Sequence, residues 1–216
     1  MKVTFFSNFL NHHQLPFCLA MDKLTNGNFT FVATAKIPKE RLQLGYADIN
    51  KKYPFVLTTY SDRVNREKAL MLAKDSDLVI IGAAPELYIR ERVRSGKITL
   101  KYTERLHKKG LSLKTLPRAV IMGWYRHGRY QKYPVYLLCA SAYTVADCAV
   151  FGNYIGRTYK WGYFPEVKAY NVEALFDKKQ HNKISLLWCG RLIDWKHPEA
   201  AVELAKRLNE AGFNST

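Results

Sequence analysis

The feature that most constrains the fold is the alternation of short apolar runs with stretches of helical periodicity. Short apolar runs that lack a polar face are typical of buried strands. The expected strands are Lys2–Ser7, Phe29–Ala35, Phe55–Tyr60, Asp77–Gly82, Val135–Ala140 and Ile184–Cys189, with one more just before Glu104. The expected helices cover 14–26, 63–75, 86–95, 143–153 and 197–211, and Leu116–Lys132 favours a helix. This alternation predicts an α/β fold with a mostly parallel sheet covered by helices on both faces.

The length of 216 residues suits one domain of about 150–200 residues and a smaller remainder. We expect residues 1–170 to form the domain, and Asn171–Lys183, which is charged and polar, to be a linker. Residues 184–216 then hold a single βα unit. Because one such unit cannot bury itself, the helix at 197–211 is expected to leave apolar surface uncovered, unless it docks on the first domain or on a partner.

Several of the expected loops carry polar side chains at positions where ligands bind in parallel sheets. Such ligands lie beyond the carboxyl ends of the strands. The residues that we expect to gather at that edge follow four different strands; they are Asn8, Asn11, His12, His13, Gly82, Glu104, Arg105, Ser141 and Tyr143. The prediction is a shared cleft formed by these loops.

Each of these loops has a structural as well as a functional interpretation. The polar side chains of Asn8–His13 either cap the following helix or bind an anionic group with its amides. A metal site is disfavoured, because adjacent histidines converge poorly and no third ligand is near in the sequence. Glu104 beside Arg105 would position a hydroxyl, act as a base, or form an exposed charge pair. The small residues that begin at Gly82 would either let a ligand approach the backbone or allow the strand and helix to pack tightly.

The charge of the chain is strongly unbalanced. Thirty-four Lys and Arg residues against eighteen Asp and Glu give a net charge of +16. A field of this sign attracts nucleic acid, an anionic membrane surface or phosphorylated substrates; the alternative is a solvated basic face with no specific ligand. The stretch GWYRHGRYQKY (123–133) would serve nucleic-acid binding through stacking and phosphate contacts, but no RRM, KH or helix-turn-helix signature accompanies it.

Cysteine usage and hydropathy indicate a cytoplasmic protein. Its four cysteines, Cys18, Cys139, Cys148 and Cys189, show no metal-binding spacing and suit reduced thiols. The first ten residues do not form a signal peptide, and no apolar run approaches the roughly 20 residues of a membrane span.

The most informative motif is GRLIDWK (190–196), which stands between an apolar run and Pro198. Arg191 and Lys196 lie on that loop, where two cations would hold a diphosphate. Neither a GxGxxG nor a GxxxxGK[ST] motif is present, so dinucleotide and P-loop sites lack their fingerprints. With VIIGAAPE, YTERLHKKG, YLLCASAYTVAD and YKWGYFPEV upstream, the stretch LLWCGRLIDWKHPEAAVELAKRL resembles the family 4 retaining glycosyltransferases.

This resemblance implies the GT-B architecture, in which two Rossmann-like domains face each other across a cleft. The first domain would hold the acceptor, and the second would hold a nucleotide-sugar donor through Arg191 and Lys196, without a metal or other cofactor. Asn8–His13 stands where many members have a glycine-rich turn, which this chain lacks. The acidic E-x7-E motif of the family would lie beyond residue 216, so the chain would be a truncated enzyme, inactive alone.

The function implied by the resemblance is sugar transfer to a sugar or lipid-linked acceptor in the assembly of cell-surface polysaccharide or glycolipid. The enzyme would be cytoplasmic and would contact the inner face of an anionic membrane. Two alternatives remain, a basic nucleic-acid-binding module and a non-catalytic remnant that binds an acceptor or a partner. The sequence assigns no catalytic residue.

Overall fold

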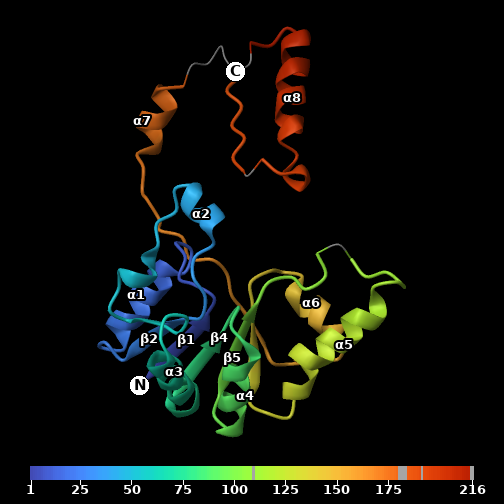
Figure 1. Ribbon diagram of the computed structural model, residues 1–216. Coiled ribbons are helices and arrows are strands. Elements are labelled where there is room, and N and C mark those ends of the chain that lie inside the picture. The colour runs from blue at the N-terminus through green and yellow to red at the C-terminus, as the bar shows by residue number, and fades with distance from the viewer. Residues whose placement is uncertain (109, 180–183, 191, 215–216) are drawn as a thin grey trace. The chain divides into compact units, whose positions relative to one another are not determined.

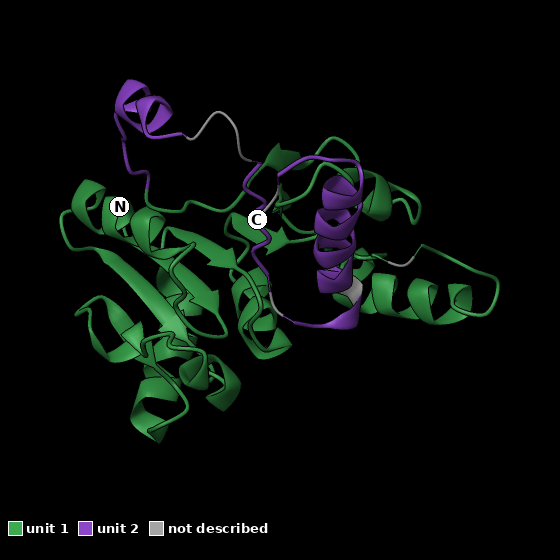
Figure 2. Cartoon of the chain, turned by 90° about the horizontal axis from the view of Figure 1, so that it is seen from above, with its two compact units in different colours: residues 1–166 green, residues 167–216 purple. Residues whose placement is uncertain are grey.

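The computed structural model describes residues 1–108, 110–179, 184–190 and 192–214. The chain divides into two compact units, Met1–Glu166 and Val167–Thr216, which are coloured separately in Figure 2. Unit 1 holds the sheet and most of the helices. Within the described residues, no helix combines the length and the apolar character that crossing a bilayer requires.

Unit 1 is built on a seven-stranded sheet in which every pairing is parallel. Its strand order is β3-β2-β1-β4-β5-β6-β7, which is Rossmann-like in that the order reverses between β1 and β4. The strands are β1 (Val3–Ser7), β2 (Phe29–Ala33), β3 (Val56–Thr58), β4 (Leu78–Ile81), β5 (Thr99–Thr103), β6 (Val135–Cys139) and β7 (Thr158–Lys160). The predicted α/β class with a parallel sheet is confirmed.

Helices cover both faces of this sheet (Figure 1). They are α1 (Leu15–Leu24), α2 (Lys39–Gln43), η1 (Ile49–Lys51), α3 (Arg63–Asp75), α4 (Glu86–Arg94), α5 (Leu116–Arg126), η2 (Gly128–Tyr130) and α6 (Thr144–Ala149). The short elements α2, η1 and β7 were not expected from the sequence. Each is too short for its periodicity to stand out against a loop.

Alternating side chains of the strands divide the core into two layers. Phe6 and Val79 pack with α3 and α4 on one face, and Phe5 and Ile80 pack with α1 on the other. All five residues of β1 are buried, as its largely apolar run predicts. Because helices close both faces, the polar groups of the sheet that a ligand can reach are expected at the ends of its strands.

Unit 2 contains α7 (Val172–Asp177), η3 (Asp194–Lys196) and α8 (Pro198–Glu210). Helix α7 lies inside the stretch expected to be a linker; the Asn171 side chain accepts a hydrogen bond from the Ala174 amide at 3.0 Å and caps it. Helix α8 forms where its periodicity predicts, and none of its residues is buried.

The prediction of a strand at Ile184–Cys189 is wrong. Ile184 donates its amide to the Asn214 carbonyl at 2.8 Å, but residues 185–189 have no regular structure. The Leu187 side chain is 91% exposed. A parallel strand is stable only when neighbouring strands satisfy its backbone groups, and the described residues of unit 2 supply no such neighbour.

A fully buried arginine joins three segments of unit 1. The guanidinium of Arg92, on α4, donates to the carbonyls of Ser76 at 2.5 Å, Asp77 at 2.9 Å and Ile98 at 2.6 Å. The first two carbonyls follow the end of α3, and the third precedes β5. Arg92 therefore holds the turn from α3 to β4 against the start of β5, and it is the donor to the carbonyl of Ser76, a fully buried residue.

We expect Arg92→Met to lower the free energy of unfolding by about 3–5 kcal/mol, because the variant leaves these carbonyls without their charged donor. The matched control is Arg94→Met on the same helix, since Arg94 is exposed and pairs with Glu91 at 2.6 Å. That change should cost about 1 kcal/mol or less. Urea unfolding of the two variants measures the difference, and equal losses would contradict the role assigned to Arg92.

Candidate functional site

The reversal of strand order between β1 and β4 marks the place where a sheet of this kind binds its ligands. The loop from β1 to α1 and the loop from β4 to α4 flank this point at the carboxyl edge. All strands are parallel, so the loops after β5, β6 and β7 meet at the same edge.

The two asparagines of the first loop shape its backbone. Asn8 Oδ1 accepts a hydrogen bond from the Phe9 amide at 2.8 Å. Asn11 Oδ1 accepts from the amides of His13 at 3.0 Å and Gln14 at 3.2 Å, just before α1 begins. Both side-chain oxygens thus stabilise the turn, as the structural interpretation of this loop proposes.

The two histidines of the loop lie in a row of rings. His12 and His13 have ring centroids 3.8 Å apart, His12 stacks on Tyr46 at 5.5 Å, and His13 lies 5.0 Å from Tyr163. Burial lowers the pKa of His13, and the neighbouring His12 and the Arg41 guanidinium lower it further. His13 is therefore a neutral imidazole near pH 7, with a ring nitrogen that can accept a hydrogen bond.

Glu104 follows β5 and joins this row through Tyr163. Its carboxylate accepts a hydrogen bond from Lys108 Nζ at 2.8 Å and another from the Tyr163 hydroxyl. These two donors, Lys108 first, hold the pKa of Glu104 below its usual value. An ionised carboxylate with a lowered pKa is a weak base, so this arrangement suits orienting a hydroxyl more than abstracting its proton.

We call His12, His13, Tyr46, Glu104 and Tyr163 the edge cluster. The amide of Phe164 donates to the His13 carbonyl at 2.9 Å and ties the chain after β7 to the loop after β1. The cluster therefore draws on segments that follow β1, β2, β5 and β7. It offers flat rings, an anionic acceptor and a neutral imidazole.

Arg105 forms a second contact set that extends from the edge cluster toward α6. Its Nε lies 3.6 Å from Asp147 Oδ2, and its guanidinium lies 4.6 Å from the ring centroid of Tyr143. Asp147 Oδ2 also accepts hydrogen bonds from the backbone amides of Leu106 at 2.8 Å and of His107 at 3.1 Å. Ser141 Oγ accepts from the Tyr143 amide at 3.3 Å and shapes its own turn.

Gly82 serves close packing at the strand crossover. A Cβ there would lie 3.1 Å from the Tyr102 ring and 3.3 Å from the Phe6 carbonyl and Ser7 Oγ. No ligand contact is needed to explain this glycine.

Glu86, at the end of the same loop, belongs to a network inside unit 1. It accepts from the Tyr130 hydroxyl at 2.5 Å and from Arg129 at 2.9 Å, and it lies 3.5 Å from Lys101 Nζ. The same lysine donates to the Arg126 carbonyl.

The expected diphosphate pair, Arg191 and Lys196, stays a prediction, because only one of its two members belongs to the described residues. Arg191 lies outside the described residues. Lys196 ends η3 in unit 2, directly before His197, whose left-handed backbone precedes Pro198. Across the described residues, no three His, Cys, Asp or Glu side chains gather as a metal ion would require.

Sequence reasoning missed Tyr46 and Tyr163, which complete the edge cluster. Tyr46 comes after α2 and Tyr163 after β7, and the sequence predicted neither of these short elements. The signal for Tyr163 was present in the aromatic run YKWGYF (159–164), because aromatic side chains at a strand end often pack over the neighbouring loop.

Comparison of the chain with protein-family models finds no match, and no curated protein matches it significantly either. The assignment of function therefore depends on the residues themselves and on their geometry.

His127, beside the network of Glu86, gives unit 1 a pH dependence. It is buried, its Nδ1 lies 3.3 Å from the Tyr154 hydroxyl, and burial with the charges of Lys101 and Arg126 lowers its pKa to about 3. Below pH 6.5 this histidine binds a proton in the unfolded chain but stays neutral in the folded chain. The contribution of His127 to the free energy of unfolding is therefore fully present above pH 6.5 and is lost as the pH decreases toward 3.

We expect His127→Phe to reduce the slope of unfolding free energy against pH by about 1 kcal/mol per unit between pH 6.5 and 5. This window lies above the titration of most carboxylates. Comparison of variant and wild type at pH 8, where His127 is neutral in both states, gives the cost of the substitution itself. An unchanged slope between pH 6.5 and 5 would contradict a buried, neutral His127.

Proposed function

We propose that unit 1 is the acceptor-side domain of a retaining GT-B glycosyltransferase of the family 4 type. The observation that carries this proposal is the edge cluster, which lies at the carboxyl edge of a Rossmann-like sheet beside its reversal of strand order. Sugar binding requires flat rings for the apolar face of the sugar and fixed polar groups for its hydroxyls. The cluster supplies both.

In this proposal the acceptor hydroxyl is oriented by the Glu104 carboxylate, which Lys108 and Tyr163 keep ionised. The rings of His12, Tyr46 and Tyr163 offer surfaces for the sugar ring. His13, neutral near pH 7, accepts a hydrogen bond from a second hydroxyl. Holding the acceptor in one orientation lowers the entropic part of the barrier to transfer.

The donor in this proposal is a nucleotide-sugar, and its diphosphate is the leaving group. Lys196 and Arg191 are assigned to that diphosphate by resemblance, where their positive charges would stabilise the negative charge that develops during transfer. The product would belong to a cell-surface polysaccharide or glycolipid made on the cytoplasmic side of a membrane.

The proposal predicts that residues 1–216 bind a saccharide through Glu104. Saturation-transfer NMR with a panel of hexoses and disaccharides should find at least one that contacts the protein. Glu104→Gln should weaken that binding by about tenfold, the loss of one charge-assisted hydrogen bond. The control is Glu67→Gln. Glu67 also pairs with a basic side chain, Arg63 at 3.0 Å, but this pair lies on the exposed side of α3 and away from the edge cluster. No bound saccharide, or equal effects of the two variants, would contradict the proposal.

The basic excess supports a further part of the proposal, contact with an anionic membrane. We expect the chain to sediment with vesicles that contain phosphatidylglycerol and to be released as the salt concentration increases. Neutral phosphatidylcholine vesicles are the control. Equal binding to both would contradict an electrostatic contact, and tighter, salt-resistant binding to single-stranded RNA would favour the nucleic-acid alternative.

A further inference from the structure

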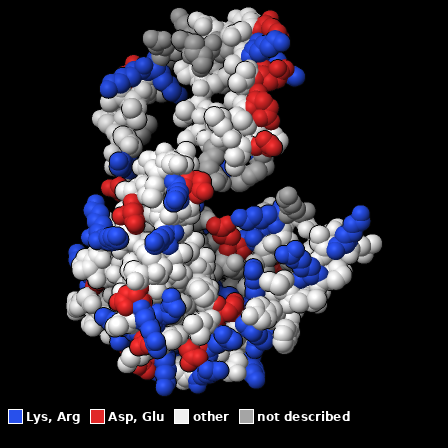
Figure 3. Space-filling model, in the orientation of Figure 1, with Lys and Arg blue, Asp and Glu red and all other residues white. Residues whose placement is uncertain are grey.

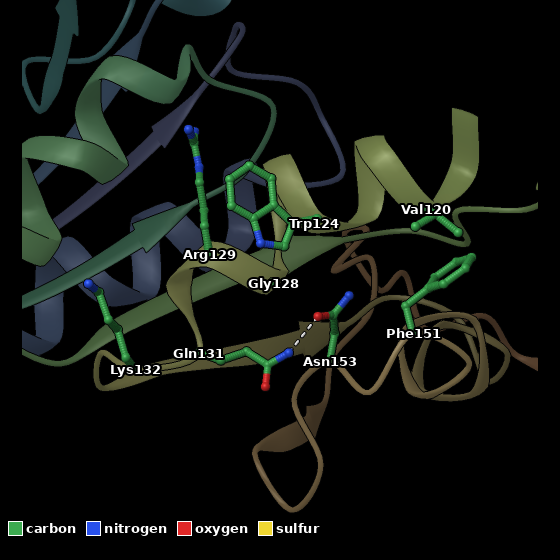
Figure 4. Close-up of a pocket in the computed structure, with 8 residues that line it drawn as sticks. All are labelled: Val120, Trp124, Gly128, Arg129, Gln131, Lys132, Phe151 and Asn153. Atoms are coloured by element: carbon green, nitrogen blue, oxygen red, sulfur yellow. Dashed lines mark hydrogen bonds between the residues drawn. The ribbon is translucent and has the colours of Figure 1, made fainter. Parts of the chain in front are cut away.

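A pocket of about 660 Å³ lies between α5, η2 and the turn from α6 to β7 (Figure 4). Its walls combine apolar, amide and basic side chains; they include Val120, Trp124, Arg129, Lys132, Phe151 and Asn153. This volume lies within the range that holds a small organic ligand.

Two features keep this pocket open and polar at its base. Asn153 is buried and its Oδ1 accepts from Gln131 Nε2 at 2.6 Å, which leaves its Nδ2 without a hydrogen-bond partner among the described residues. Gly128 lies beside it, and a Cβ there would approach Trp124 Cδ1 to 3.2 Å and Asn153 Oδ1 to 3.3 Å. A larger residue than glycine would fill the space, and the amide nitrogen of Asn153 is a donor for a ligand oxygen.

The apolar wall of the pocket continues onto an exposed helix face. Val120 and Trp124 stand one turn apart on α5, and the Trp124 side chain is 62% exposed. Leu116 and Ile121 on the same helix are exposed as well. Soluble proteins rarely leave a contiguous apolar face of this kind without a partner.

The charge around the pocket has a single sign. From Arg105 to Lys132 every charged residue is basic, and the first acid after Glu104 is Asp147. Figure 3 shows basic side chains among uncharged surface in the region where Figure 1 places α5. Lys132, on the pocket wall, is exposed. An occupant that is both apolar and anionic would gain from both properties of this region.

We propose that this pocket binds one anionic phospholipid, with a phosphate oxygen at Asn153 Nδ2 and the first hydrocarbon segments along Trp124, Val120 and Phe151. Lys132 lines the pocket on the other side of Gln131, and its positive charge favours an anionic occupant without sharing the contact at Asn153. A free sugar would leave the apolar wall unused, and a bare phosphate would gain nothing from the indole. Gln131 and Lys132 directly precede β6, and Phe151 and Asn153 precede β7. The pocket therefore lies toward the amino ends of these strands and is distinct from the edge cluster at their carboxyl ends.

The test uses residues 1–216 and dihexanoylphosphatidic acid at concentrations below micelle formation, with binding measured by titration calorimetry. We expect saturable binding of this lipid, and much weaker binding of dihexanoylphosphatidylcholine and of inorganic phosphate. Phosphate binding as tight as that of the phosphatidic acid would overturn the lipid assignment, as would equal binding of the zwitterionic lipid. The absence of any binding at millimolar lipid would overturn the proposal.

Two pairs of variants separate the pocket from a general attraction to α5. Trp124→Ala should weaken binding about tenfold, whereas Ile121→Ala, at a side chain 65% exposed on the same helix but outside the pocket, should leave it nearly unchanged. Lys132→Gln should weaken binding severalfold, and Lys114→Gln, which removes an equal charge nearby, should not. Equal losses within either pair would overturn the pocket. All four side chains are exposed, so thermal unfolding should show intact folds.

Discussion

Every described strand of unit 1 runs in the same direction, and the helices close both faces of the sheet that these strands form. This constraint decides where polar chemistry is possible. Side chains within the strands are committed to two apolar layers, so the residues available to a ligand are those that follow strand ends. The reversal of strand order between β1 and β4 then separates the loops on either side and opens the edge to a ligand. The composition of the edge cluster follows from this arrangement.

The two proposed binding regions of unit 1 differ in the physical property that each uses. The edge cluster combines rings with a carboxylate whose pKa is held down by Lys108 and Tyr163, and it suits a neutral ligand rich in hydroxyls. The region of α5 combines an exposed apolar face with basic side chains and suits an anionic amphiphile. The topology puts the cluster at the carboxyl ends of the strands and the pocket toward the amino ends of β6 and β7. The two proposed regions therefore lie at separate places on one domain.

The sequence was sufficient to predict the elements whose periodicity is strong. The largely apolar run of β1 predicts a strand and the helical spacing of α3 predicts a helix, and both elements are confirmed. The expected strand at Ile184–Cys189 has the same kind of pattern but no neighbouring strand in the described structure, which shows that an apolar run predicts a strand only where partners exist. The loops at the carboxyl edge were predictable from the parallel topology. Tyr46 and Tyr163 were not, because they follow short elements and reach the cluster through tertiary contacts. Arg92 was equally hidden, since nothing local distinguishes it from the exposed Arg94.

We propose that this protein binds its ligand at the carboxyl edge of the sheet. Mapping backbone amide shifts by NMR during titration with a bound saccharide tests it most directly. We expect shifts confined to Asn8–Gln14, to Glu104–Lys108 and to the residues around Tyr46 and Tyr163, with those of α5 and β7 unchanged. Shifts that avoid these segments and gather elsewhere in the chain would contradict binding at this edge.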